Sequence, residues 1–147
     1  MDRSWNGPTG LDPALVGAYR TADYHVVGPE TRFVLHVDES SPALAALHAT
    51  ARSTCSAWLT ACNPASVLQS NDENAAAQRS LKQRLERNGD RWLDGFGADP
   101  CGRGPAEPGV LALGRDRDAA IEMARDFGQN ALLWAGADAI PRLLLLR

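Results

Sequence analysis

The residue best suited to acid or base chemistry is Glu107, which stands between a Gly/Pro-rich stretch and an apolar run. A carboxyl group in that position can give or accept a proton, or pair with an arginine. Glutamate is also common on solvated loops, where it has no further role. The sequence therefore names Glu107 as the catalytic candidate, with a solvated loop carboxylate as the alternative.

Carboxamide side chains stand at two further element ends. Asn63 follows an apolar segment that stops at the Asn63-Pro64 turn signal. Gln129 and Asn130 follow Gly128, which is expected to end a helix. An amide offers both a donor and an acceptor, so these groups suit recognition of a polar ligand. The alternatives are local: Asn63 would bond its own backbone in a turn, and the other two amides would satisfy free carbonyls at the helix end.

Asn74 lies in the predicted first turn of a helix, where asparagine is a mediocre helix former, and it can reach across to the Asn63 loop. Ser70 and Glu73 have capping-box spacing, and acidic residues at this helix start favour a satisfied cap over phosphate binding. A tyrosine would stack on a planar ligand or simply pack, and an arginine would add positive charge. The full set of ligand-binding candidates is Asn63, Ser66, Asn74, Gln129, Asn130, Tyr24 and Arg20.

Neither a metal nor a cofactor is predicted. The chain has three cysteines and three histidines, and none of them shows metal-ligand spacing. Phosphate-binding, dinucleotide-binding and metalloprotease motifs are all missing from the sequence.

Bulk composition predicts one globular unit. The chain has 147 residues, of which 44% are hydrophobic, and a formal net charge of −3. We expect a flexible leader over residues 1–12 and a single α/β domain over residues 13–147. The acidic charge argues against nucleic-acid binding. The sequence shows no signal peptide and no apolar run long enough to cross a bilayer, so we expect a cytoplasmic location without a membrane partner.

Hydrophobic periodicity and turn residues divide the chain into strands and helices. Strands are expected at residues 25–27, 32–37, 56–62, 92–96, 110–113, 131–134 and 143–146, with the first two pairing as a hairpin. Helices are expected to begin near Pro13 and Pro42, after Ser70 and after Asp116. From residue 55 onward the order is β-α-β-β-α-β plus a final strand. This order predicts an α+β, ferredoxin-like (split βαβ) sandwich, with a mostly antiparallel sheet and helices packed on one face.

Several short strings together resemble the bacterial family called domain of unknown function 3293. The resemblance spans residues 19–146, and it implies no established activity. The chain departs from the family pattern at residues 102–106, which lack the aromatic residue expected before Glu107. The strings that carry the resemblance are residues 19–24, Thr60-Ala61-Cys62-Asn63-Pro64-Ala65-Ser66, Asn74, Glu107-Pro108-Gly109 and Phe127-Gly128-Gln129-Asn130-Ala131.

Two functions of different classes follow. The first is a site for a polar small molecule or nucleotide-like ligand, lined by amides and one carboxylate. The sequence does not decide whether that site is enzymatic. The second is a non-catalytic interaction or regulatory module that acts through a sheet edge or face, such as the apolar run at residues 143–146. Pairing of two chains through that edge would give a homodimer.

Overall fold

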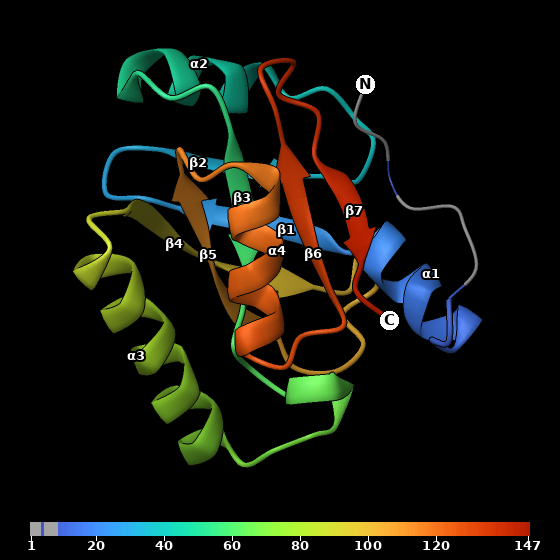
Figure 1. Ribbon diagram of the computed structural model, residues 1–147. Coiled ribbons are helices and arrows are strands. Elements are labelled where there is room, and N and C mark those ends of the chain that lie inside the picture. Colours follow the sequence, from blue (N-terminus) through green and yellow to red (C-terminus); the bar gives the residue numbers. More distant parts are fainter. Residues whose placement is uncertain (1–3, 5–8) are drawn as a thin grey trace.

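The computed structural model describes residue 4 and residues 9–147, and its strands form one curled antiparallel sheet (Figure 1). The sheet order is β2-β1-β4-β5-β3-β6-β7. Figure 1 shows the sheet as a half-barrel, in which β1 and β2 cross behind β6 and β7. The elements are α1 (Pro13–Thr21), β1 (Asp23–Val27), β2 (Arg32–Leu35), α2 (Pro42–Ala51), β3 (Ser56–Leu59), the 3₁₀ turn η1 (Pro64–Ser66), α3 (Asn71–Arg87), β4 (Arg91–Ala98), β5 (Glu107–Leu113), α4 (Arg117–Asp126), β6 (Ala131–Ala135) and β7 (Arg142–Leu145).

The centre of the sheet contains two interleaved β-α-β connections. β3 and β4 run parallel with β5 between them, because each pairs antiparallel with β5. In the same way β5 and β6 run parallel on either side of β3. Helices α3 and α4 make these two connections. The β1–β2 hairpin extends the sheet at one edge and β7 extends it at the other.

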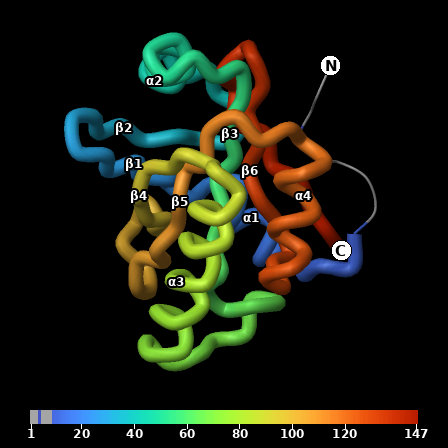
Figure 2. Tube along the Cα trace, turned by 60° about the vertical axis from the view of Figure 1, so that its left-hand side comes forward, coloured from blue at the N-terminus to red at the C-terminus, as the bar shows by residue number. Residues whose placement is uncertain are grey.

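The helices lie on both faces of the sheet, so the expectation of helices on one face is wrong. Leu81 and Leu85 of α3 and Met123 of α4 pack on one face, whereas Leu44 of α2 packs on the other. Figure 2 shows α3 and α4 together on the near side of the sheet, with α1 behind it. The physical reason is that β3 is buried along its whole length on both sides, so each face needs its own cover.

Local sequence accounts for the helix ends. The Ser70 hydroxyl accepts the Glu73 N–H, and the Glu73 carboxylate accepts the Ser70 N–H, which completes the expected capping box of α3. Ser41 caps α2 in front of Pro42. None of the helices in the described part of the chain has the length and apolar character that a bilayer crossing requires.

Two strands are longer than expected. β5 begins at Glu107 rather than Val110, and β4 continues to Ala98. Gly109 and Pro108 pair with Gly95 and Phe96 across these strands, although glycine and proline usually indicate a loop. Glu107 is therefore the first residue of a strand, fixed by the sheet, and not a loop residue.

Part of the expected flexible leader lies outside the described residues, namely residues 1–3 and 5–8. Ser4 is buried, and its hydroxyl accepts the backbone N–H of Leu143 at 2.9 Å and donates to Asp38. The Ser4 hydroxyl thus occupies one backbone donor of the edge strand β7.

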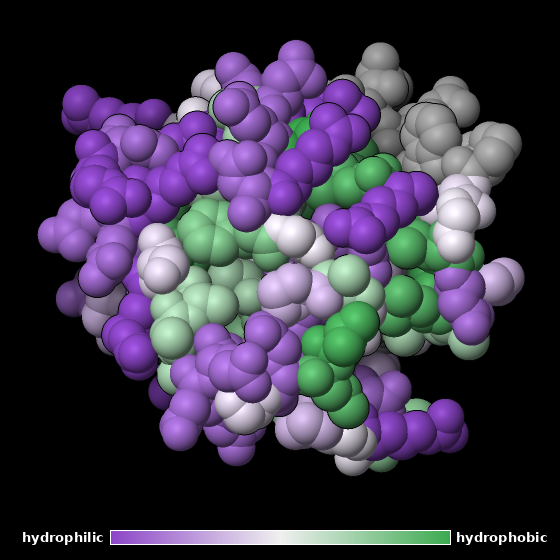
Figure 3. Space-filling model, turned by 60° about the horizontal axis from the view of Figure 1, so that its bottom comes forward, coloured by the Kyte–Doolittle hydropathy of each residue, from purple (hydrophilic) through white to green (hydrophobic). Residues whose placement is uncertain are grey.

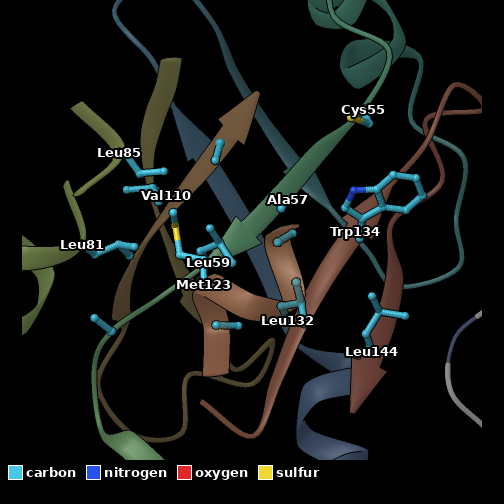
Figure 4. Packing of buried hydrophobic residues seen from close by; sticks show 14 residues of the cluster. Cys55, Ala57, Leu59, Leu81, Leu85, Val110, Met123, Leu132, Trp134 and Leu144 are labelled. Atoms are coloured by element: carbon cyan, nitrogen blue, oxygen red, sulfur yellow. The ribbon is translucent and has the colours of Figure 1, made fainter. Parts of the chain in front are cut away.

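The two faces of the sheet carry separate hydrophobic clusters. Figure 4 shows the cluster under α3 and α4, where Leu81, Leu85 and Met123 meet Leu59 and Val110 of the central strands. The other cluster surrounds Trp58. Because side chains alternate along a strand, Trp58 faces away from its neighbour Leu59.

Trp58 lies on a floor of two glycines that face each other across β4 and β5. A Cβ atom at Gly109 would overlap the Trp58 indole, and one at Gly95 would lie 2.7 Å from the indole Cη2 and collide with the His25 carbonyl. The missing side chains therefore let the indole lie directly against the sheet.

We expect Gly109→Ala to lower the free energy of unfolding by about 1–3 kcal/mol, because the added methyl overpacks Trp58. Urea denaturation measures the loss. Gly97→Ala in β4 is the matched control, since its Cβ would lie 3.8 Å from the nearest atom of Tyr24 and fits without strain. Equal stability of the two variants would contradict the proposed glycine floor.

Candidate functional site

A cavity of about 320 Å³ lies between α1 and the ends of β3, β4 and β5. Its volume is within the range of small-molecule sites. One side is polar, with Thr60, Asn63, Ser66, Asp99, Glu107 and Gln129. The other side is apolar, with Tyr19, Tyr24, Trp58, Leu132, Leu133 and Leu143 among its residues. The end of the molecule that carries η1 is seen in Figure 3, where apolar surface gathers among hydrophilic side chains.

Glu107 presents a largely buried carboxylate at the polar side of the cavity. Its Oε2 accepts a hydrogen bond from Asn63 Nδ2 at 3.0 Å. Burial raises the pKa of the Glu107 carboxyl above its ordinary value, and hydrogen bonds from Asn63 and Thr60 offset part of the rise. Among the described residues no ion pair involves Glu107. The result is a carboxyl group whose ionised form is poorly compensated and can exchange a proton nearer neutral pH.

Asn63 connects this carboxylate to the start of α3. Its Oδ1 accepts from Asn74 Nδ2 and from the Gln69 N–H, both at 2.9 Å. Its own backbone N–H donates to Asn74 Oδ1, which also accepts from Gln69 Nε2. Both ends of the Asn63 amide are therefore used, and the interaction with Asn74 is reciprocal.

The segment that follows Asn63 has an unusual backbone. Asn63, Ala65 and Ser66 all have positive φ, at 47°, 56° and 61°. Asparagine tolerates this region, but alanine and serine do so at a cost of roughly 1–2 kcal/mol each. Backbone bonds from the Ala65 N–H to Gly128 and from the Ser66 N–H to Asn63 hold the turn in place. Such strain persists where surrounding contacts over-determine a conformation, and it clusters at functional sites.

The amides after α4 support this turn from the other side. Gln129 Nε2 donates to the Cys62 carbonyl at 3.0 Å and to the Phe127 carbonyl at 3.3 Å. Asn130 Nδ2 donates to the Ser66 hydroxyl at 2.9 Å, and that hydroxyl also lies 2.6 Å from the Tyr19 hydroxyl. Asn130 Oδ1 is buried and has no partner in the described chain. These amides thus position the turn.

Tyr24 forms the apolar wall together with Trp58. The two rings meet edge to face with centroids 5.7 Å apart. The Tyr24 hydroxyl donates to the Tyr19 carbonyl at 2.6 Å. Burial, with smaller contributions from Tyr19 and Glu107, raises the pKa of the Tyr24 phenol far above its ordinary value. The phenol therefore stays neutral and serves as a wall and a hydrogen-bond donor.

The structure brings most of the candidate residues named from the sequence to one place. Five of them line the cavity: Tyr24, Asn63, Ser66, Glu107 and Gln129. Asn74 and Asn130 do not line it but hold lining residues through the bonds described above. Arg20 does not line it either, and its guanidinium lies 3.9 Å from the Asp38 carboxylate.

The lining also includes residues that were not site candidates from the sequence, among them Trp58, Thr60, Cys62 and Asp99. Alternation along the strand expected at residues 56–62 would have placed the first three on one face. In the structure β3 ends earlier, at Leu59. Burial raises the pKa of the Cys62 thiol, with Glu107 adding to the rise, so the reactive thiolate is disfavoured. In the part of the chain that the structure describes, no three His, Cys, Asp or Glu side chains are grouped so that they could hold a metal ion.

The comparison with protein families identifies the chain. A family model described as "Protein of unknown function (DUF3293)" matches residues 59–132, which is half of the chain. The chain belongs to this family. The matched DUF3293 region includes Thr60, Asn63, Asn74, Glu107 and Gln129, so it contains the polar side of the cavity. No curated protein matches the chain, and neither does any solved structure.

Removal of Asn74 tests its link to Asn63. We expect Asn74→Ala to lower the free energy of unfolding by about 1–3 kcal/mol, since Asn63 loses a donor and an acceptor at once. Urea denaturation measures the change. Asn71→Ala is the matched control, because Asn71 is exposed one turn earlier in the same helix. A loss no larger than that of the control would contradict the structural role of Asn74.

The raised pKa of Glu107 predicts a pH-dependent stability. The folded chain binds the Glu107 proton more tightly than the unfolded chain does. The stability that this proton contributes is therefore fully present below the ordinary pKa of 4.5 and is lost as pH rises through the pKa of the folded chain. Glu107→Gln removes this loss while keeping an acceptor for Asn63. We expect the variant to gain stability relative to wild type as pH rises above 4.5.

Urea denaturation at a series of pH values measures this difference. The exposed Glu86→Gln variant of α3 controls for the loss of one formal charge. Wild-type and Glu107→Gln curves that stay parallel over the whole range would show that burial does not perturb this carboxyl.

Proposed function

We propose that the chain binds a small molecule with a polar group in this cavity, and that Glu107 and Asn63 recognise the polar group. The observation that carries the proposal is convergence: the cavity is lined from α1, β1, the β3–η1 segment, the facing ends of β4 and β5, and the α4–β6 connection. Concave sites with an apolar wall and a few fixed polar groups are the usual form of ligand sites. The strained turn at residues 63–66 and the buried carboxyl support the same conclusion.

If the bound molecule reacts, Glu107 is the group that would transfer a proton. Its raised pKa brings the protonated and ionised forms closer to balance near neutral pH, which suits a general acid or base. Covalent catalysis by Cys62 is not proposed, because burial and the nearby Glu107 disfavour its thiolate.

We also infer that β3, α3, β4, β5, α4 and β6 form a ferredoxin-like unit at the centre of the larger sheet. The support is the interleaving of the two parallel pairs and the packing of α3 and α4 on a common face. This inference makes β1, β2 and β7 additions to the unit. The alternative function, an interaction module acting through the β7 edge, has less support, because Ser4 already occupies the Leu143 N–H on that edge.

A thermal-shift screen over nucleosides, amino acids, amines and other polar metabolites tests the proposed site. A ligand that binds only the native chain at about 100 times its Kd adds roughly 2.7 kcal/mol of stability. We expect Gly97→Leu, which adds a side chain beside Tyr24 at the cavity wall, to weaken binding more than tenfold. Arg125→Ala, on the exposed side of α4, is the control and should bind as wild type does. A ligand whose shift survives Gly97→Leu unchanged binds elsewhere and contradicts the proposal.

A further inference from the structure

We propose that the ligand of this cavity is an organic cation, an ammonium or guanidinium compound that carries an apolar or aromatic body. This assignment rests on the proposed function, since it names the chemical class that the same cavity takes. The charge of the lining and the chemistry of its aromatic and apolar residues both point to it.

The charges on the cavity lining are all negative. Asp99 and Glu107 line the cavity, and no lysine, arginine or histidine does so in the described chain. Asp99 Oδ2 accepts the backbone N–H groups of Cys101 and Arg103, which fixes this carboxylate at the end of β4. A phosphate or carboxylate ligand would need cationic donors and would instead meet two carboxylates.

Among the described residues no cation pairs with the half-buried Glu107 carboxylate. Its side-chain donors, Asn63 Nδ2 and the Thr60 hydroxyl, carry no formal charge. A carboxylate taken out of water is costly unless a cation and hydrogen bonds compensate it. A ligand ammonium or guanidinium in the cavity would supply the missing positive charge and a second set of donors.

The aromatic residues of the lining favour the same charge. Tyr19, Tyr24 and Trp58 are the aromatic residues of the lining, and aromatic rings attract a cation that lies over their faces. Trp58 is held flat on the Gly95 and Gly109 floor, so the ring that meets the ligand is fixed by the backbone.

The apolar side of the cavity accounts for the body of the ligand. Leu133 and Leu143 are part of the cavity lining, and so is Leu68, which has 83% of its surface exposed. A small aryl or alkyl group would cover these surfaces. A volume of about 320 Å³ suits a ligand of that size and excludes one much larger.

Three probes of matched size and different charge test the assignment: benzylammonium, benzyl alcohol and benzoate. Titration calorimetry at low salt should show benzylammonium binding at least tenfold tighter than benzyl alcohol, with benzoate weakest. Glu107→Gln should remove most of the preference for the cation while leaving binding of benzyl alcohol unchanged. Asp99→Asn, which keeps an acceptor for the loop, should remove a smaller part. Gly97→Leu should abolish binding of every probe.

The outcomes separate the two proposals. The cation assignment is wrong if benzoate or inorganic phosphate binds more tightly than benzylammonium. It is also wrong if both carboxylate variants leave the preference for the cation unchanged. In either case the cavity remains a binding site. If neither these probes nor methylguanidinium and tetramethylammonium bind, and the wider metabolite screen also finds no ligand, both proposals are wrong. The comparison of probes on the wild-type chain decides the charge preference even if Glu107→Gln does not fold.

Discussion

The hydrogen bond from the Asn63 amide to the Glu107 carboxylate is the contact on which the rest of the site depends. Its donor comes from a strained turn and its acceptor from the first residue of a strand, 44 positions away in sequence. Asn74 and Gln69 hold the other end of the same amide. The capped start of α3, the turn and the sheet therefore meet at one side chain. This amide, together with Thr60, supplies the side-chain hydrogen bonds that the Glu107 carboxylate accepts.

Local signals predicted the elements well where one short stretch of chain decides the structure. Ser70 and Glu73 predicted the start of α3 because a capping box needs only residues three positions apart, and both of its bonds form. The hairpin across Gly28 formed for the same reason. The possible reach of Asn74 to the Asn63 loop could also be inferred, since asparagine gains little from a place in a helix unless its amide has a partner.

Long-range pairing explains what the sequence did not reveal. Pro108 and Gly109 indicate a loop by composition, and only the facing residues of β4 make them part of a strand. Asp99 enters the site because β4 ends beside the start of β5, which no spacing within the chain indicates. The helices on both faces follow from the burial of β3 on both sides, a property of its central place in the sheet order.

The Gly95 and Gly109 floor beneath Trp58 means that the side chains of the cavity differ in how freely they can be replaced. Any side chain at Gly95 or Gly109 displaces the indole, so the aromatic platform is fixed by the scaffold itself. The polar groups of the lining come instead from the ends of β4 and β5 and from the turn after β3. Under the proposed function, a change of ligand preference would therefore come from these end and turn residues rather than from the platform.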